Sequence, residues 1–179
     1  MEKRTEQKPS PQSEPWLRGT HGELDAIVRQ FVHSMEQVEE DAERWCVGLS
    51  DAEMNARPMG LPPVAFHLRH MSRSLDRLLS YAEGTQLEAT QLAALKSEMD
   101  ARASAADVFE ELRRGLAESK RRAQSFSPEQ YNEERGIGRK MLPATVGSIL
   151  VHCVEHTQRH LGQAITTAKV LIALRRTMQ

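Results

Sequence analysis

The amino-acid sequence predicts an all-α protein, a four-helix bundle. Apolar side chains recur every three or four residues in four long segments, which is the pattern of amphipathic helices. Glycine- and proline-containing breaks separate these segments, and none alternates apolar and polar residues long enough to indicate a strand. Four helices that must each bury an apolar stripe, without a sheet to cover, indicate a bundle.

The first two predicted helices are bounded by glycine and proline. The first begins after Gly22 and ends near Gly48, where a glycine provides a stop. Ser50 and Glu53 have the spacing of a capping box for a short helical turn. The second long helix begins after the Gly60-Leu61-Pro62-Pro63 break and ends at Gly84.

The other two helices lie in the second half of the chain. Residues 85–103 are ambiguous and contain at most a short helix before a polar, alanine-rich connection. Ser104, with Asp107, caps the third helix. The fourth runs from about Ala144 to the end.

Length and composition indicate one domain, over residues 16–179. Residues 1–15 are polar and contain three prolines, so we expect a disordered or loosely docked lead-in. This lead-in has no apolar stretch typical of a signal peptide, and no window is apolar enough to span a membrane. The net charge of −1 predicts no attraction to nucleic acid or to an anionic membrane. We therefore expect a cytoplasmic protein with two reduced cysteines.

Three histidines occur in nine residues of the fourth helix. His152, His156 and His160 are each four residues apart, so they lie on one face of the helix. The Cβ atoms of successive histidines are then about 5–6 Å apart. His152 and His160 are about 12 Å apart along the axis, so only an adjacent pair can share one ion. On a helical wheel, His160 and His156 lie about 40° and 80° from the centre of the apolar stripe, and His152 about 120°. The pair His156 and His160 therefore points more towards the interior.

The second helix offers a further imidazole in the segment AFHLRHM. His67 lies about 60° from the apolar centre of its helix and His70 about 120°, so the wheel alone favours His67. The alternative interpretation is that these histidines are core or surface residues with ordinary hydrogen-bond partners. Spacing alone leaves both interpretations open.

The two histidine segments together resemble those of a known family. HCVEHTQRHLGQ, which starts at His152, resembles the last-helix signature of the DinB/YfiT-like superfamily. AFHLRHMSRSLDRLLSYAEG, residues 65–84, resembles its second-helix signature, and the order of elements also agrees over residues 16–175. The resemblance implies a four-helix bundle with up-down-down-up connectivity.

The resemblance also implies a divalent metal, zinc or nickel, bound by His70, His156 and His160. The resemblance favours His70 over His67, whereas the helical wheel favours His67. Three imidazoles leave an open position, where water becomes more acidic or a thiol binds as the thiolate. Relatives of this kind imply a metal-dependent enzyme, a thiol-dependent S-transferase or a hydrolase, that acts on a small molecule with a low-molecular-weight thiol.

Several functional questions stay open in the sequence. A homodimer is expected from the resemblance, and no general base is evident. The alternative function is a non-catalytic stress or sensor module whose metal is structural. Cys153 is expected to be a buried small hydrophobe rather than a fourth ligand.

Overall fold

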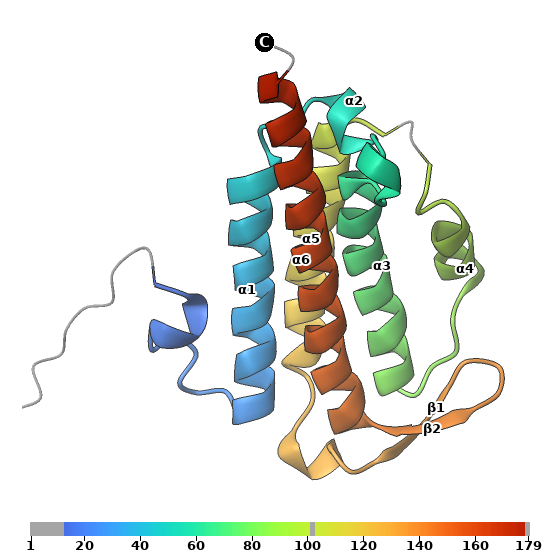
Figure 1. Cartoon of the computed structure of the whole chain (residues 1–179). Helices are drawn as coiled ribbons and strands as arrows, with labels where there is room; N and C mark the ends of the chain where they lie inside the picture. The colour runs from blue at the N-terminus through green and yellow to red at the C-terminus, as the bar shows by residue number, and fades with distance from the viewer. Residues whose placement is uncertain (1–12, 101–102, 178–179) are drawn as a thin grey trace, which may run out of the picture.

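The structure, a computed structural model, describes residues 13–100 and 103–177, and is mostly helical (Figure 1). Four long helices make up its body: α1 (Ala26–Cys46), α3 (Val64–Ala82), α5 (Ala105–Ala123) and α6 (Val146–Thr177). Helix α6 packs against α1 and α3, and α5 packs against the same two helices. In the view of Figure 1, α1 and α6 run upwards and α3 and α5 run downwards.

Short elements connect the long helices. They are η1 (Pro15–Leu17), α2 (Asp51–Met54), η2 (Pro58–Gly60), α4 (Ala89–Lys96) and η3 (Pro128–Gln130). Helix α4 falls within the segment that the sequence left ambiguous. Residues 1–12 of the predicted lead-in lie outside the described residues, and Pro15, at its end, is buried in η1.

The expectation that the chain has no strands is wrong at one place. Strands β1 (Glu134–Ile137) and β2 (Leu142–Thr145) form an antiparallel hairpin before α6. Each strand has four residues, which is too few for an alternating pattern to stand out in the sequence. Figure 1 shows the hairpin projecting across the lower end of α3.

Side-chain caps mark where α1, α2 and α5 begin. Asp25 accepts hydrogen bonds from the backbone N–H groups of Ile27 and Val28 and so starts α1. The predicted cap of α5 is confirmed, because the Ser104 hydroxyl accepts from the N–H of Asp107. The capping box before α2 is confirmed as well.

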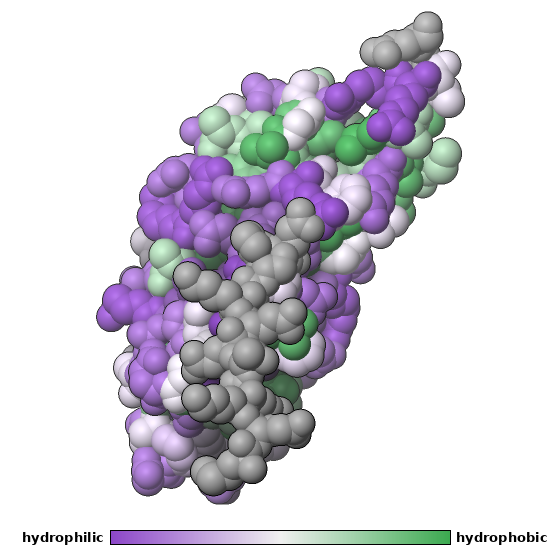
Figure 2. Space-filling model, turned by 90° about the vertical axis from the view of Figure 1, so that its left-hand side faces the viewer, coloured by the Kyte–Doolittle hydropathy of each residue, from purple (hydrophilic) through white to green (hydrophobic). Residues whose placement is uncertain are grey.

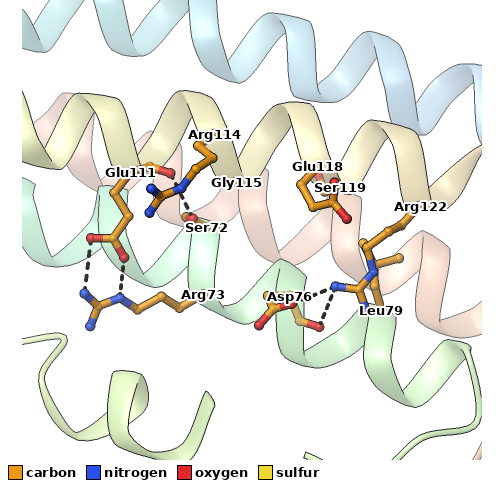
Figure 3. Close-up of a pocket in the computed structure, with 10 residues that line it drawn as sticks. All are labelled: Ser72, Arg73, Asp76, Leu79, Glu111, Arg114, Gly115, Glu118, Ser119 and Arg122. Atoms are coloured by element: carbon orange, nitrogen blue, oxygen red, sulfur yellow. Dashed lines mark hydrogen bonds and ion pairs between the residues drawn. The ribbon is translucent and has the colours of Figure 1, made fainter. Parts of the chain in front are cut away.

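Helices α3 and α5 approach each other closely. A Cβ atom added at Gly115 would lie 2.0 Å from Ser72 Oγ and 2.8 Å from Ser72 Cβ, so any other residue there would force the two helices to shift. Ion pairs flank this contact in Figure 3: Arg73 binds Glu111 at 2.5 Å, and Arg122 binds Asp76 at 2.7 Å. The cavity between these side chains has a volume of about 410 Å³, and its lining mixes both signs of charge.

The face of the molecule on the side of α1 is largely polar. Figure 2 views it from the side of α1 and shows hydrophilic residues over most of this face, with hydrophobic residues gathered towards its upper end. Within the described residues, no helix is both long enough and apolar enough to cross a membrane.

Candidate metal centre

Three half-buried histidines meet between α3 and α6. His70 comes from the second turn of α3, and His156 and His160 lie one turn apart on α6. Their ring centroids are 4.3 Å (His70–His160), 4.6 Å (His156–His160) and 5.0 Å (His70–His156) apart. Each ring offers one ligand atom, and the three atoms lie within 4.8 Å of one another. The structure therefore brings together the three residues that the resemblance implies.

The hydrogen bonds of these rings leave the same nitrogen available on each. Nδ1 of His70 is 2.7 Å from Glu98 Oε2, and Nδ1 of His156 is 3.4 Å from the hydroxyl of Ser74. Nδ1 of His160 is 3.0 Å from Nδ1 of His67. All three contacts use Nδ1, so Nε2 is the atom that each ring can give to a metal ion.

The distance between two of these Nε2 atoms suits a transition metal. Nε2 of His70 and Nε2 of His156 are 3.3 Å apart. Zinc–nitrogen bonds of about 2.0–2.1 Å in a tetrahedral site place two ligand nitrogens about 3.3 Å apart. A set of three imidazoles suits zinc, nickel, copper and iron better than calcium or magnesium, which prefer oxygen ligands. The residues present therefore fit a group that holds a divalent transition metal.

Burial keeps the two imidazoles on α6 neutral. It lowers the pKa of His156 and of His160 to about 4, and neighbouring imidazoles lower both further. A histidine must be neutral to bind a metal ion, so both rings are ready to do so at neutral pH.

Glu98 is a part of the site that the sequence analysis missed. Its carboxylate is almost completely buried and binds His70 Nδ1 on one oxygen and Arg77, at 2.9 Å, on the other. Burial raises the pKa of Glu98, but the hydrogen bonds from His70 and Arg77 outweigh this effect and hold the pKa below its usual value. A carboxylate on the outer nitrogen of a metal-binding histidine fixes the ring and its tautomer.

His67, which the wheel favoured, does face the interior but stays outside the group of three. It is 2% exposed, and burial lowers its pKa to about 4. If His160 binds metal through Nε2, its proton is on Nδ1 and is donated to Nδ1 of His67. The proton of His67 is then on Nε2, which is buried without a hydrogen-bond partner in the described part of the chain.

The remaining neighbours define an apolar wall and an outer flank. The ring of Phe66 stacks on His70, with centroids 5.4 Å apart, and makes a T-shaped contact with His160. His152 is exposed, pairs with Glu155 and is not one of the three grouped residues, although its ring centroid lies 5.6 Å from that of His156. Cys153 is fully buried, and burial raises the pKa of its thiol to about 12, as expected of a core residue.

Comparison with known proteins settles the family. The profile of the DinB superfamily matches residues 10–164, which is most of the chain. The chain belongs to the DinB superfamily. The histidine group of this DinB superfamily protein thus occurs in a family whose members are associated with metal ions.

A solved structure supports the same fold. The conserved protein of locus from Enterococcus faecalis superimposes with a TM-score of 0.68, over 84% of this chain and 99% of that one. The two sequences are 19% identical, so the likeness concerns the fold alone. No curated protein matches the DinB superfamily chain described here.

Proposed function

We propose that this DinB superfamily protein binds one divalent ion, zinc or nickel, through Nε2 of His70, His156 and His160. The observation that carries the proposal is the shared orientation of the rings. A partner occupies every Nδ1, the Nε2 atoms of His70 and His156 lie 3.3 Å apart, and one ligand atom of each ring lies within 4.8 Å of the other two. Core histidines without a ligand have no need for this arrangement, since their two nitrogens can each take an ordinary partner.

The proposed function is that of a metal-dependent enzyme. In the described part of the chain, the group contains three ligating residues and no fourth, which is typical of catalytic rather than structural sites. A divalent ion held there would acidify a bound water or bind a thiol as the thiolate. This chemistry fits a thiol-dependent S-transferase or a hydrolase that acts on a small molecule together with a low-molecular-weight thiol.

The residues around the group have positioning roles in this proposal. Glu98 holds His70, and His67 holds His160, each through Nδ1. Phe66 covers two of the rings with an apolar surface and so excludes water from that side. Both effects favour one fixed coordination geometry with a defined open side.

The proposal extends to the architecture and assembly of the chain. The packing of α1, α3, α5 and α6 supports an up-down-down-up four-helix bundle of the DinB/YfiT-like kind. We also propose a homodimer, which light scattering of the purified protein would test. The two free, buried cysteines support a cytoplasmic location.

Spectroscopy of the cobalt-substituted protein tests the open site. Tag-free protein loaded with Co²⁺ is titrated with 2-mercaptoethanol, and a thiolate-to-metal charge-transfer band is expected to grow in. The band should be absent in His160→Ala and present in His152→Ala, which removes an exposed histidine from the same helix. A loaded protein whose spectrum no thiol or small anion changes has no exchangeable position, and the alternative, a non-catalytic metal-binding or sensor module, would then hold.

A further inference from the structure

A second group of metal-ligating side chains lies at the other side of the molecule. It consists of His21, in the loop before α1, and His33 and Glu36 on α1 itself. Figure 1 shows the loop before α1, in blue, beside the lower half of α1, whereas the histidines of the first group belong to α3 and α6. Each of the three residues offers one ligand atom, and these atoms lie within 4.8 Å of one another.

The contacts within this group are already short. Nε2 of His21 is 2.8 Å from Glu36 Oε1, and the ring centroids of His21 and His33 are 5.4 Å apart. His33 and Glu36 are three residues apart on α1, so they lie on the same face of the helix. His33 is 4% exposed, and its Nε2 is 3.1 Å from the hydroxyl of Thr20. One helix face and one loop therefore supply three donors to a common point.

The loop that carries His21 is fixed to α1. The guanidinium of Arg18 binds both carboxylate oxygens of Glu40, at 2.5 and 2.7 Å, and donates to the carbonyl of Ser13 at 2.7 Å. A bidentate pair of this kind holds the chain in one orientation. His21 itself has a left-handed backbone (φ 58°), which turns the loop before α1 begins. The donors are thus positioned before any ion binds.

The surroundings of the group favour a cation. A surface cavity of about 430 Å³ includes Glu36 and is lined by four carboxylates and two cationic side chains: Arg18, Thr20, Glu36, Glu39, Glu40, Glu43 and Lys120. Arg18 and Lys120 pair with Glu40 and Glu39, and Arg113 pairs with Glu43. Glu36 instead faces His21. The carboxylate nearest the two imidazoles is therefore the one available to an ion.

We propose that His21, His33 and Glu36 form a second divalent-cation site, with zinc as the ion that fits the donors best. Two imidazole nitrogens and one carboxylate oxygen are a common zinc ligand set, and water completes the fourth position. Calcium and magnesium prefer oxygen donors and are disfavoured here. The same residues without an ion would form a simple histidine–glutamate pair, so the two interpretations differ in the number of ions bound.

Zinc titration of tag-free protein tests the second site. Calorimetry and elemental analysis should give about two zinc ions per chain for the wild type and about one for both His160→Ala and Glu36→Gln. Because a ligand is lost, Glu36→Gln should weaken one binding step by more than the about 10–100-fold cost of losing an outer-shell partner. Glu39→Gln, which removes the same charge one turn away on α1, is the matched control and should retain both ions.

The variants separate this inference from the proposed function. A wild type that binds one ion, lost in His160→Ala and kept in Glu36→Gln, would overturn the second site and leave the first intact. Two ions retained in both Glu36→Gln and His21→Ala would also overturn it, since the second ion would then bind elsewhere. Retention of one ion by His160→Ala, lost on adding Glu36→Gln, supports the second site whatever the first one does.

Discussion

The buried carboxylate of Glu98 gives a sharp test of the metal centre. Its two oxygens face two donors, the N–H of His70 Nδ1 and the guanidinium of Arg77. The variant Glu98→Gln keeps the size of the side chain but offers one oxygen and one NH₂ group. One of the two donors would then face another donor in a buried position, and the orientation of His70 would no longer be fixed.

The expected effect is on metal affinity. Loss of such an outer partner weakens metal binding by about 10–100-fold, or about 1.4–2.7 kcal/mol. A competition titration of zinc against a chromophoric chelator measures this change, with Glu110→Gln, an exposed glutamate on α5, as the control. Thermal unfolding of the metal-free variants shows whether the connection after α4 is also weakened. Wild-type zinc affinity in a folded Glu98→Gln would refute the assignment of Glu98 to His70.

Three further predictions concern packing, the inner histidine and pH. Gly115→Ala should destabilise the protein by about 1–3 kcal/mol, because the new methyl group meets the Cβ and backbone of Ser72 and forces α3 and α5 apart. The control is Gly162→Ala, at a position of α6 with open space around it. This control should leave the free energy of unfolding unchanged or raise it by up to about 1 kcal/mol. Chemical denaturation measures both, and equal stabilities would contradict the close contact. His67→Leu should weaken zinc binding by about tenfold, since Nδ1–H of His160 loses its hydrogen-bond acceptor. An unchanged zinc affinity in a competition titration would mean that His67 contributes packing alone. The metal-free protein should lose stability as pH falls from about 6.5 towards 4, because the buried imidazoles, with pKa values of about 4, stay neutral while the unfolded chain takes up protons. Denaturation curves measured across this pH range check this prediction. If the rings were solvated, the free energy of unfolding would not change with pH through these histidines.

The long helices were predictable because their signals are local. Apolar periodicity located all four, and Ser104 and Gly84 marked a start and a stop that the structure retains. The hairpin before α6 escaped because each strand has four residues and its turn uses a left-handed backbone at Gly138 and at Met141. A left-handed methionine has no signature in the sequence.

The site was predictable only in part, for a physical reason. A wheel ranks residues by how directly they face the core, and His67, which it ranked first, is indeed the buried one. The grouped rings of His70, His156 and His160 are half-buried, at the edge of the apolar stripes, where an open metal position would meet solvent. Glu98 lies 28 residues from His70 in an irregular connection, so no spacing rule links them. Only the folded chain shows that contact.

The most direct measurement is the metal content of tag-free protein purified without chelators. Elemental analysis would compare the wild type with His160→Ala and with His152→Ala, the exposed neighbour on the same helix. We predict that His160→Ala loses about one divalent ion per chain relative to the wild type and that His152→Ala loses none. Equal metal content in all three proteins, or a wild type that takes up neither zinc nor nickel, would contradict the metal centre between α3 and α6.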